Sequence, residues 1–314
     1  MLAKFNLFLQ KWMPILTPLS LIIGVVFESV GQQLLFLVAW LFALMTFISS
    51  LSMKFQDVKV FVLYPKTILI VILFLHLLMP LWAFFLSTII FNDTLLMIGF
   101  VLSVAVPTGV TSIIWVTISR GNIPLSLAIV LIDTLLAPII MPLLLEVVAG
   151  QTIHIDMKSL IFDLIWMVVL PSVVGIIINE KTNGAIHRKL NPYLSPLSKI
   201  CLFAVVMINS SAIAPFIKDI TLELFLVIIV VFIISVSGYV FAYLLSKILW
   251  SDDVEMKTAF LFTAGMRNIA LGIVIATTYF PSKVAMPVVF GMLFQQVLAS
   301  VMYRINERMK KAAT

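Results

Sequence analysis

The sequence has few charged residues and a single cysteine. Of its 314 residues, 11% are charged and 62% are hydrophobic, whereas soluble domains carry about 25% charged and about 45–50% apolar residues. This shortage of charge excludes an ordinary soluble protein, and the lack of a basic, water-facing surface excludes a nucleic-acid-binding module. One cysteine, Cys201, excludes an intramolecular disulfide and a cysteine metal cluster. The composition is that of a polytopic membrane protein.

The chain also lacks the sequence motifs of common enzymes and pumps. It has no HExxH, Walker A or GxSxG motif. No connection between apolar stretches is long enough to fold a nucleotide-binding domain, which excludes a self-contained ATP-driven pump. We therefore expect no enzymatic activity and no cofactor. A secondary transporter is the favoured class, and a non-transporting membrane sensor or channel subunit is the alternative from another class.

Ten apolar stretches are candidates to cross the roughly 30 Å hydrocarbon core, for which a helix needs about 20 apolar residues. A loop at Gly150–Lys158 separates five stretches from five, which predicts a first repeat at 1–150 and an inverted second repeat at 151–314. The fold class is therefore an all-α membrane protein of ten transmembrane helices. The predicted spans are Trp12–Phe27, Gln32–Met53, Thr67–Thr88, Thr94–Ser119, Ile123–Ala149, Ser159–Asn179, Ser195–Phe216, Leu222–Leu249, Val254–Phe280 and Ala285–Ile305.

Lysine and arginine residues gather on one side of these spans. With a cytoplasmic N-terminus, sixteen fall inside, and only Lys158, Lys218 and Lys283 fall outside. Because cytoplasmic loops collect Lys and Arg, we predict that both termini are cytoplasmic. The compact loops favour a bacterial inner membrane. The lipid bilayer is then the expected partner, nucleic acid is not, and the oligomeric state stays open.

The fourth and ninth predicted spans are interrupted near their middle. The interruptions are Val106-Pro107-Thr108-Gly109-Val110-Thr111-Ser112 and Thr263-Ala264-Gly265-Met266-Arg267-Asn268. Proline removes a backbone donor, and unwound backbone inside a membrane is tolerated only where protein or a water-filled cavity satisfies it. Matching interruptions in two halves mark a transport site. Ordinary kinks are the alternative, since Gly and Pro are frequent in membrane helices.

Two ionisable residues, Asp133 and Arg267, are predicted to lie about 15 Å from the ends of their spans, at about 1.5 Å per residue. Each costs about 2.5–3.5 kcal/mol at this depth, so we expect them to face the interior and to pair directly or through water. A purely structural salt bridge is the alternative. His76 is expected to be a hydrogen-bonded structural residue more than a proton relay. Of Gln295 and Gln296 at least one should point inward.

Two stretches resemble the bile acid:sodium symporter family. One is Pro107-Thr108-Gly109-Val110-Thr111-Ser112 followed by Ser119-Arg120-Gly121-Asn122-Ile123-Pro124-Leu125-Ser126; the other is Gly265-Met266-Arg267-Asn268 followed by Leu271-Gly272 and Ala276. Span number and chain length agree as well, so the resemblance covers essentially the whole chain. It implies a panel domain of helices 1, 2, 6 and 7 beside a core domain of helices 3–5 and 8–10, in which discontinuous helices 4 and 9 cross. It also implies sodium-driven alternating-access transport of organic anions, including bile acids and small carboxylates.

The resemblance assigns residues to the sodium sites, and several of them depart from the family pattern. Ser112 and Ser126 match hydroxyl ligands of sodium, and Asn268 matches the crossover asparagine beside the substrate. Thr263 stands where the family has a glutamate shared by both sodium sites, and Arg267 stands in place of a glutamine; Ile113 and Val130 replace an asparagine and a threonine. A hard cation prefers several oxygen ligands and is repelled by a guanidinium, so we expect that the two sodium sites do not both form.

These observations predict a secondary transporter of a small organic anion, in which Arg267 replaces a bound sodium ion and Asp133 takes a proton. The expected substrate contacts are Arg267, Asn268, Thr108, Gly109, Thr111, Gln295 and Gln296. The expected ion-coupling residues are Asp133, Ser112, Ser126, Thr263 and Met266, with sodium as the alternative ion. Another carrier family with five-plus-five repeats, such as the drug/metabolite or auxin-efflux-like carriers, is the alternative within the transporter class.

Overall fold

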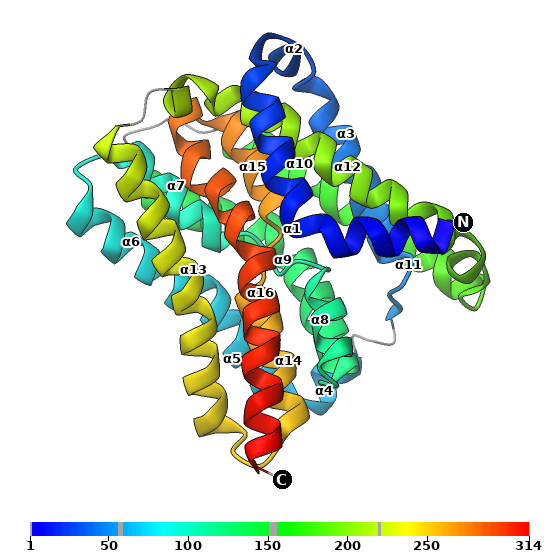
Figure 1. Cartoon of the computed structure of the whole chain (residues 1–314). Helices are drawn as coiled ribbons and strands as arrows, with labels where there is room; N and C mark the ends of the chain where they lie inside the picture. The colour runs from blue at the N-terminus through cyan, green and yellow to red at the C-terminus, as the bar shows by residue number, and fades with distance from the viewer. Residues whose placement is uncertain (1, 56–58, 151–155, 219–220, 314) are drawn as a thin grey trace.

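The computed structural model describes residues 2–55, 59–150, 156–218 and 221–313, and in these ranges the regular elements are all helices (Figure 1). The all-α prediction is confirmed. The helices are α1 (Leu2–Val26), α2 (Glu28–Gln33), α3 (Phe36–Ser50), α4 (Lys59–Leu63), α5 (Pro65–Leu73), the π-helix η2 (Phe74–Leu78), α6 (Met79–Ile90), α7 (Thr94–Ala105), α8 (Ser112–Ile118), α9 (Ile123–Ala149), α10 (Met157–Leu164), the π-helix η3 (Ile165–Val169), α11 (Leu170–Lys181), α12 (Ala185–Lys218), α13 (Leu222–Leu249), α14 (Val254–Gly265), α15 (Ile269–Tyr279), the 3₁₀-helix η4 (Ser282–Val284) and α16 (Ala285–Ala313).

Six helical runs of the described chain are long and apolar enough to cross a membrane, and α1 makes a seventh if its two segments count as one span. The six runs are Pro65–Ile90, Ile123–Ala149, Met157–Lys181, Ala185–Ile217, Leu222–Leu249 and Ser282–Lys310. The helices α3, α7 and α15 are apolar but shorter. A multi-pass membrane protein is therefore established, while ten spans in two inverted repeats remain a prediction. Residues 151–155, at the predicted division of the repeats, lie outside the described ranges.

Two helices begin ten residues earlier than the sequence predicted. We expected the first span to start at Trp12 and the seventh at Ser195, but α1 begins at Leu2 and α12 at Ala185. Both added segments are too polar to resemble a span, and α1 packs against α12, where Asn6 accepts hydrogen bonds from Ser195 and Lys199. In α1 the axis bends by 73° between Lys4–Met13 and Ile15–Val26, and Figure 1 shows the N-terminal segment turned away from the rest of the helix.

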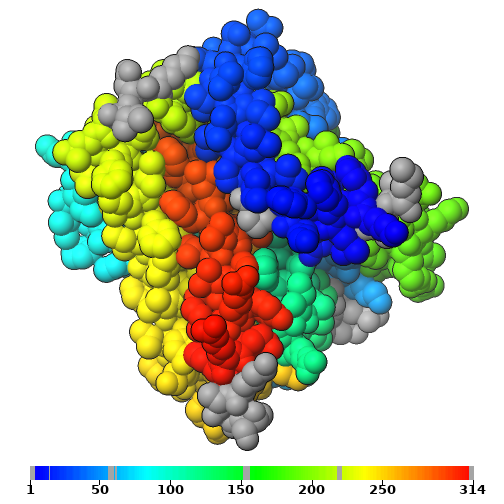
Figure 2. Space-filling view, in the orientation of Figure 1, coloured from blue at the N-terminus to red at the C-terminus, as the bar shows by residue number. Residues whose placement is uncertain are grey.

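The helices pack in two groups. In the first group, contacts link α1, α2, α3, α10, η3, α11 and α12; in the second, contacts link α4, α5, η2, α6, α7, α8, α9, α13, α14, α15, η4 and α16. The two groups meet where α1 contacts α16 and where α12 contacts α15 and α16. Figure 2 shows one face of this junction, where the N-terminal segment of α1 lies beside α16 and above α8. We refer to these sets as the first and second helix groups.

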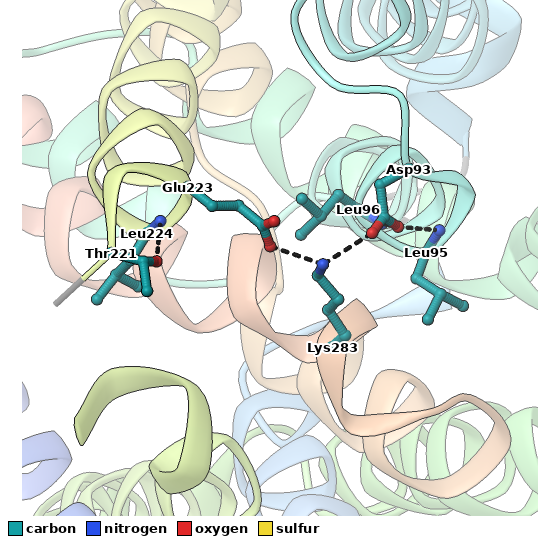
Figure 3. A network of polar contacts seen from close by, with 7 residues as sticks. All are labelled: Asp93, Leu95, Leu96, Thr221, Glu223, Leu224 and Lys283. Atoms are coloured by element: carbon teal, nitrogen blue, oxygen red, sulfur yellow. Dashed lines mark hydrogen bonds and ion pairs between the residues drawn. The ribbon is translucent and has the colours of Figure 1, made fainter. Parts of the chain in front are cut away.

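An ionic cluster fixes helix ends within the second group (Figure 3). The ammonium of Lys283 in η4 lies 2.7 Å from Asp93 Oδ2 and 2.6 Å from Glu223 Oε1 on α13. Asp93 also caps α7 by accepting hydrogen bonds from the amides of Leu95 and Leu96, at 2.8 and 3.1 Å. Burial by itself would raise the pKa of Asp93, but Lys283 and the two amides outweigh it and hold this pKa below its ordinary value. The cluster anchors the starts of α7 and α13 to the segment that leads into α16.

Candidate substrate cavity and helix crossover

The two predicted interruptions are present, and they contact each other. Helix α7 ends at Ala105 and α8 begins at Ser112, while α14 ends at Gly265 and α15 begins at Ile269. The Gly109 amide donates to the Met266 carbonyl at 3.0 Å, and the Asn268 amide donates to the Pro107 carbonyl at 2.7 Å. Each interruption thus supplies hydrogen-bond partners for backbone that would otherwise be unsatisfied in a membrane. The expected crossing of two broken helices is confirmed in this respect.

Small residues allow this close approach. A Cβ atom at position 109 would lie 2.8 Å from the main-chain oxygen of Arg267, and one at position 265 would lie 2.2 Å from the ring of Tyr239. Backbone atoms cannot move away as a flexible side chain can. The glycine of the first interruption is therefore required by the crossing itself.

Asp133 is completely buried beneath the crossover and pairs with a histidine. Its Oδ1 lies 2.5 Å from Nε2 of His76, and its Oδ2 accepts a hydrogen bond from the Thr108 amide at 2.6 Å. The expected direct pair with Arg267 is not what the structure shows, because the carboxylate oxygens already face His76 and Thr108. Arg267 instead acts on Asp133 through its charge. His76, which the sequence ranked as a structural histidine, is the partner that sequence reasoning missed.

A π-helical turn explains the position of the Arg267 guanidinium. Pro80 has no N–H to donate, and the amide of Met79 donates to the Phe74 carbonyl in the π-helix η2. The Leu75 carbonyl therefore accepts no hydrogen bond from the amide of Met79, which bonds to Phe74, or from residue 80, which is proline. Nη2 of Arg267 donates to this carbonyl at 3.5 Å instead. Single π-helical turns occur frequently at functional sites. Proline in the third span therefore prepares an acceptor for the buried cation.

Arg267 faces both the crossover and the interior of the second helix group. Its amide donates to Oε1 of Gln295 on α16 at 3.1 Å, and only 5% of the residue is exposed. Nη1 of the guanidinium has no hydrogen-bond partner among the described residues. A small void of about 30 Å³ lies beside it, lined also by Tyr239 and Gln295. The buried guanidinium thus keeps a nitrogen whose N–H groups are unsatisfied, and such a group in a native structure requires an explanation.

A cavity of about 580 Å³ lies between the two helix groups. This is within the range of roughly 300–1,000 Å³ that small-molecule sites occupy. Its walls come from α1, α3 and α12 of the first group and from the crossover, α8 and α16 of the second. Six of the seven expected substrate residues line it, namely Gly109, Thr111, Arg267, Asn268, Gln295 and Gln296. Thr108 does not; it is fully buried, and its hydroxyl donates to the Thr263 carbonyl at 3.2 Å.

The five residues expected to couple ions lie behind this cavity, and none of them lines it. The hydroxyls of Ser126 and Thr263 donate to the carbonyls of Asn122 and Ala259, at 2.9 and 2.8 Å. The buried hydroxyl of Ser112 has no partner in the described part of the chain. Met266 contributes its carbonyl to the crossover. The described residues contain no cluster of three or more His, Cys, Asp and Glu side chains that would hold a metal ion.

Comparison with known proteins identifies the family. Residues 11–311 match the SBF-like CPA transporter family. The chain belongs to this family. Bacillus subtilis YbaS is 42% identical to it over 296 residues, which are 94% of this chain and 96% of YbaS. The B. subtilis protein YocS, named a sodium-dependent transporter, is 26% identical over 84% of this chain and 83% of its own length.

A plant relative extends the comparison. The chloroplastic BASS1 of Arabidopsis thaliana, named a probable sodium/metabolite cotransporter, is 29% identical over 82% of this chain and 64% of its own length. Membership of the SBF-like CPA transporter family makes this protein a membrane transporter and not an enzyme, as its lack of catalytic motifs predicted.

Proposed function

We propose that this family member carries a small organic anion across the membrane by alternating access, with the substrate bound in the 580 Å³ cavity. The observation that supports an anionic substrate is the positive charge of the residues that line the cavity. The cavity is lined by the basic residues Lys11, Lys199 and Arg267, and its described lining contains neither Asp nor Glu. Clefts lined by charges of one sign concentrate ligands of the opposite sign.

The structure corresponds, in this proposal, to an inward-facing state. The cavity extends to Ile118 and His187, at helix ends predicted to be cytoplasmic. On the opposite side the two helix groups are joined by the Tyr279 hydroxyl, which donates to Asp163 on α10, and by Thr277, whose Oγ1 donates to Asn209 on α12 at 3.3 Å. Opening to the outside requires that these two contacts separate. Rocking of one helix group against the other would do this while leaving the crossover intact.

We further propose that protons rather than sodium ions drive the cycle. His76 and Asp133 form a buried pair within the second helix group, and in this scheme the pair takes up a proton from one side of the membrane and releases it to the other. Protonation of Asp133 would remove its attraction for Arg267 and change the positive potential at the crossover. A sodium ion beside the same guanidinium would be repelled, by about 4 kcal/mol for unit charges ~4 Å apart at an effective dielectric constant of 20. Relatives named as sodium-dependent make sodium coupling the rival outcome.

Flux measurements in proteoliposomes test both parts of the proposal. Carboxylates, sulfonates and conjugated steroids are first screened for thermal stabilisation of the purified protein, and stabilising anions are then radiolabelled for uptake. We expect counterflow of at least one anion and uptake that follows an imposed pH gradient in the absence of sodium. D133N should abolish stimulation by the pH gradient, whereas E146Q, on the exposed side of the same helix, should retain it. Strict sodium dependence without pH dependence would refute the coupling scheme, and absence of counterflow would refute carrier function.

A further inference from the structure

A second basic residue lines the substrate cavity on the wall opposite to the crossover. Lys199 lies on α12 in the first helix group, whereas Arg267 lies at the crossover in the second. The Lys199 ammonium donates to Oδ1 of Asn6 at 2.7 Å and to Oγ of Ser195 at 3.0 Å. Ser195 itself donates to the same Asn6 oxygen at 3.1 Å. Contacts between α1 and α12 therefore fix the position of this ammonium.

The partners of Lys199 leave its charge uncompensated. Both acceptors are neutral, and no ion pair of Lys199 exists among the described residues. An ammonium has three N–H donors, and the two acceptors use two of them. A half-buried cation that is oriented but not neutralised is a suitable contact for an anionic group of a ligand, since charge-assisted hydrogen bonds are the stronger kind.

The cavity also has apolar lining residues, and its described lining contains no acidic residue. Ile113, Trp115 and Leu202 are among the residues that line it. The cavity therefore has basic groups on both walls, Arg267 at the crossover and Lys199 on α12 with Lys11 on α1, together with apolar surface. A ligand with one anionic end satisfies only one of these basic positions.

We infer that Lys199, supported by Asn6 and Ser195, forms a second anion subsite, and that the preferred substrates carry an anionic group at each end of an apolar scaffold. This inference rests on the proposed function and specifies its substrate class. The crossover receives one anionic group and Lys199 the other. Both helix groups then hold the same substrate molecule, so that its release requires the wall carrying Lys199 to separate from the crossover.

Two probes of equal chain length test the inference. Decanedioate and decanoate have the same number of carbon atoms but two and one carboxylates, and their binding to protein in lipid nanodiscs is measured by isothermal titration calorimetry. We expect wild-type protein to bind decanedioate roughly tenfold or more tightly than decanoate. One additional hydrogen bond to a charged group is enough to produce this difference in affinity. K199M should remove this preference while leaving decanoate affinity within about twofold. K199R should retain the preference, because it keeps the charge.

The control variant is K158M, which removes a lysine that is exposed and outside the cavity, and it should bind both probes as wild type does. Equal wild-type affinities for the two probes overturn the inference, as does equal weakening of both by K199M or failure of both probes to bind. Counterflow of a monoanion in the proteoliposome assay would then show that the proposed transport function stands while the second subsite does not.

Discussion

Replacement of Asp133 by asparagine tests the energetics of the buried charges. The substitution removes the negative charge that faces His76 and interacts with Arg267. It also replaces one of the two carboxylate oxygens, which face the Thr108 amide and His76, by an NH₂ group that cannot accept a hydrogen bond. Leaving a buried charge without its partner costs about 3–5 kcal/mol, a large part of the roughly 5–15 kcal/mol that stabilise a typical domain.

Removal of the positive charge as well should recover part of this loss. At an effective dielectric constant of 20 two unit charges ~4 Å apart interact by about 4 kcal/mol, and Asp133 and Arg267 do not form an ion pair, so their coupling is smaller. We expect the D133N/R267M double variant to be more stable than D133N by less than about 3 kcal/mol, because couplings within one network are about 0.5–3 kcal/mol and R267M has a cost of its own. The lost hydrogen bond from Arg267 to the Leu75 carbonyl keeps the recovery incomplete.

The assay is thermal unfolding of the purified protein in detergent. Because membrane proteins often unfold irreversibly, all variants are compared by apparent Tm at one scan rate. E146Q is the matched control, since Glu146 is exposed on the same helix and surface substitutions usually change stability by less than about 0.5 kcal/mol. A double variant that melts at or below D133N would show that the two charges do not compensate each other, and the electrostatic argument for the crossover would fail.

Three further predictions concern the crossover and its surroundings. G109A should abolish transport because its Cβ would meet the facing main-chain oxygen at 2.8 Å, whereas G291A, whose nearest neighbour lies at 3.5 Å, should retain uptake in the same assay. Folding lowers the pKa of Asp93, so the ionised carboxylate stabilises the protein fully above its ordinary pKa of 3.8, and this contribution is lost as the pH falls through the lowered pKa. D93N should therefore reduce the fall of Tm at acid pH. An unchanged fall of Tm at acid pH would contradict this. Y279F removes the hydroxyl that joins α15 to α10. It should increase the labelling, by an impermeant maleimide, of a cysteine introduced on the predicted outer side. Unchanged labelling would show that this contact does not help to close the cavity on that side.

Much of the candidate site could be predicted from the sequence because the membrane restricts what a chain can do. Proline and glycine within an apolar stretch predicted the two interruptions, and six of the seven residues expected to contact the substrate, from these interruptions and the tenth span, line the cavity. Unpaired backbone is so costly in hydrocarbon that such residues have few structural explanations. The predicted partner of Asp133, Arg267, was wrong because the two charges were paired only by their expected depth in the membrane. Depth does not specify which helices face each other. The proline four residues after His76 indicates a free main-chain acceptor, which Arg267 uses at Leu75, and it does not indicate that His76 pairs with Asp133.

The sequence by itself determined that the protein is helical, lies in a membrane, and has interruptions in two of its apolar stretches, because hydropathy and backbone hydrogen bonding act over short distances along the chain. Only the tertiary structure decided that His76 meets Asp133, that Arg267 reaches the Leu75 carbonyl, and that Lys199 lines the same cavity as the crossover. Each of these arrangements brings together segments far apart in the sequence, and it depends on how their helices pack against one another. Packing of this kind is collective, so no local pattern in the amino-acid sequence specifies it.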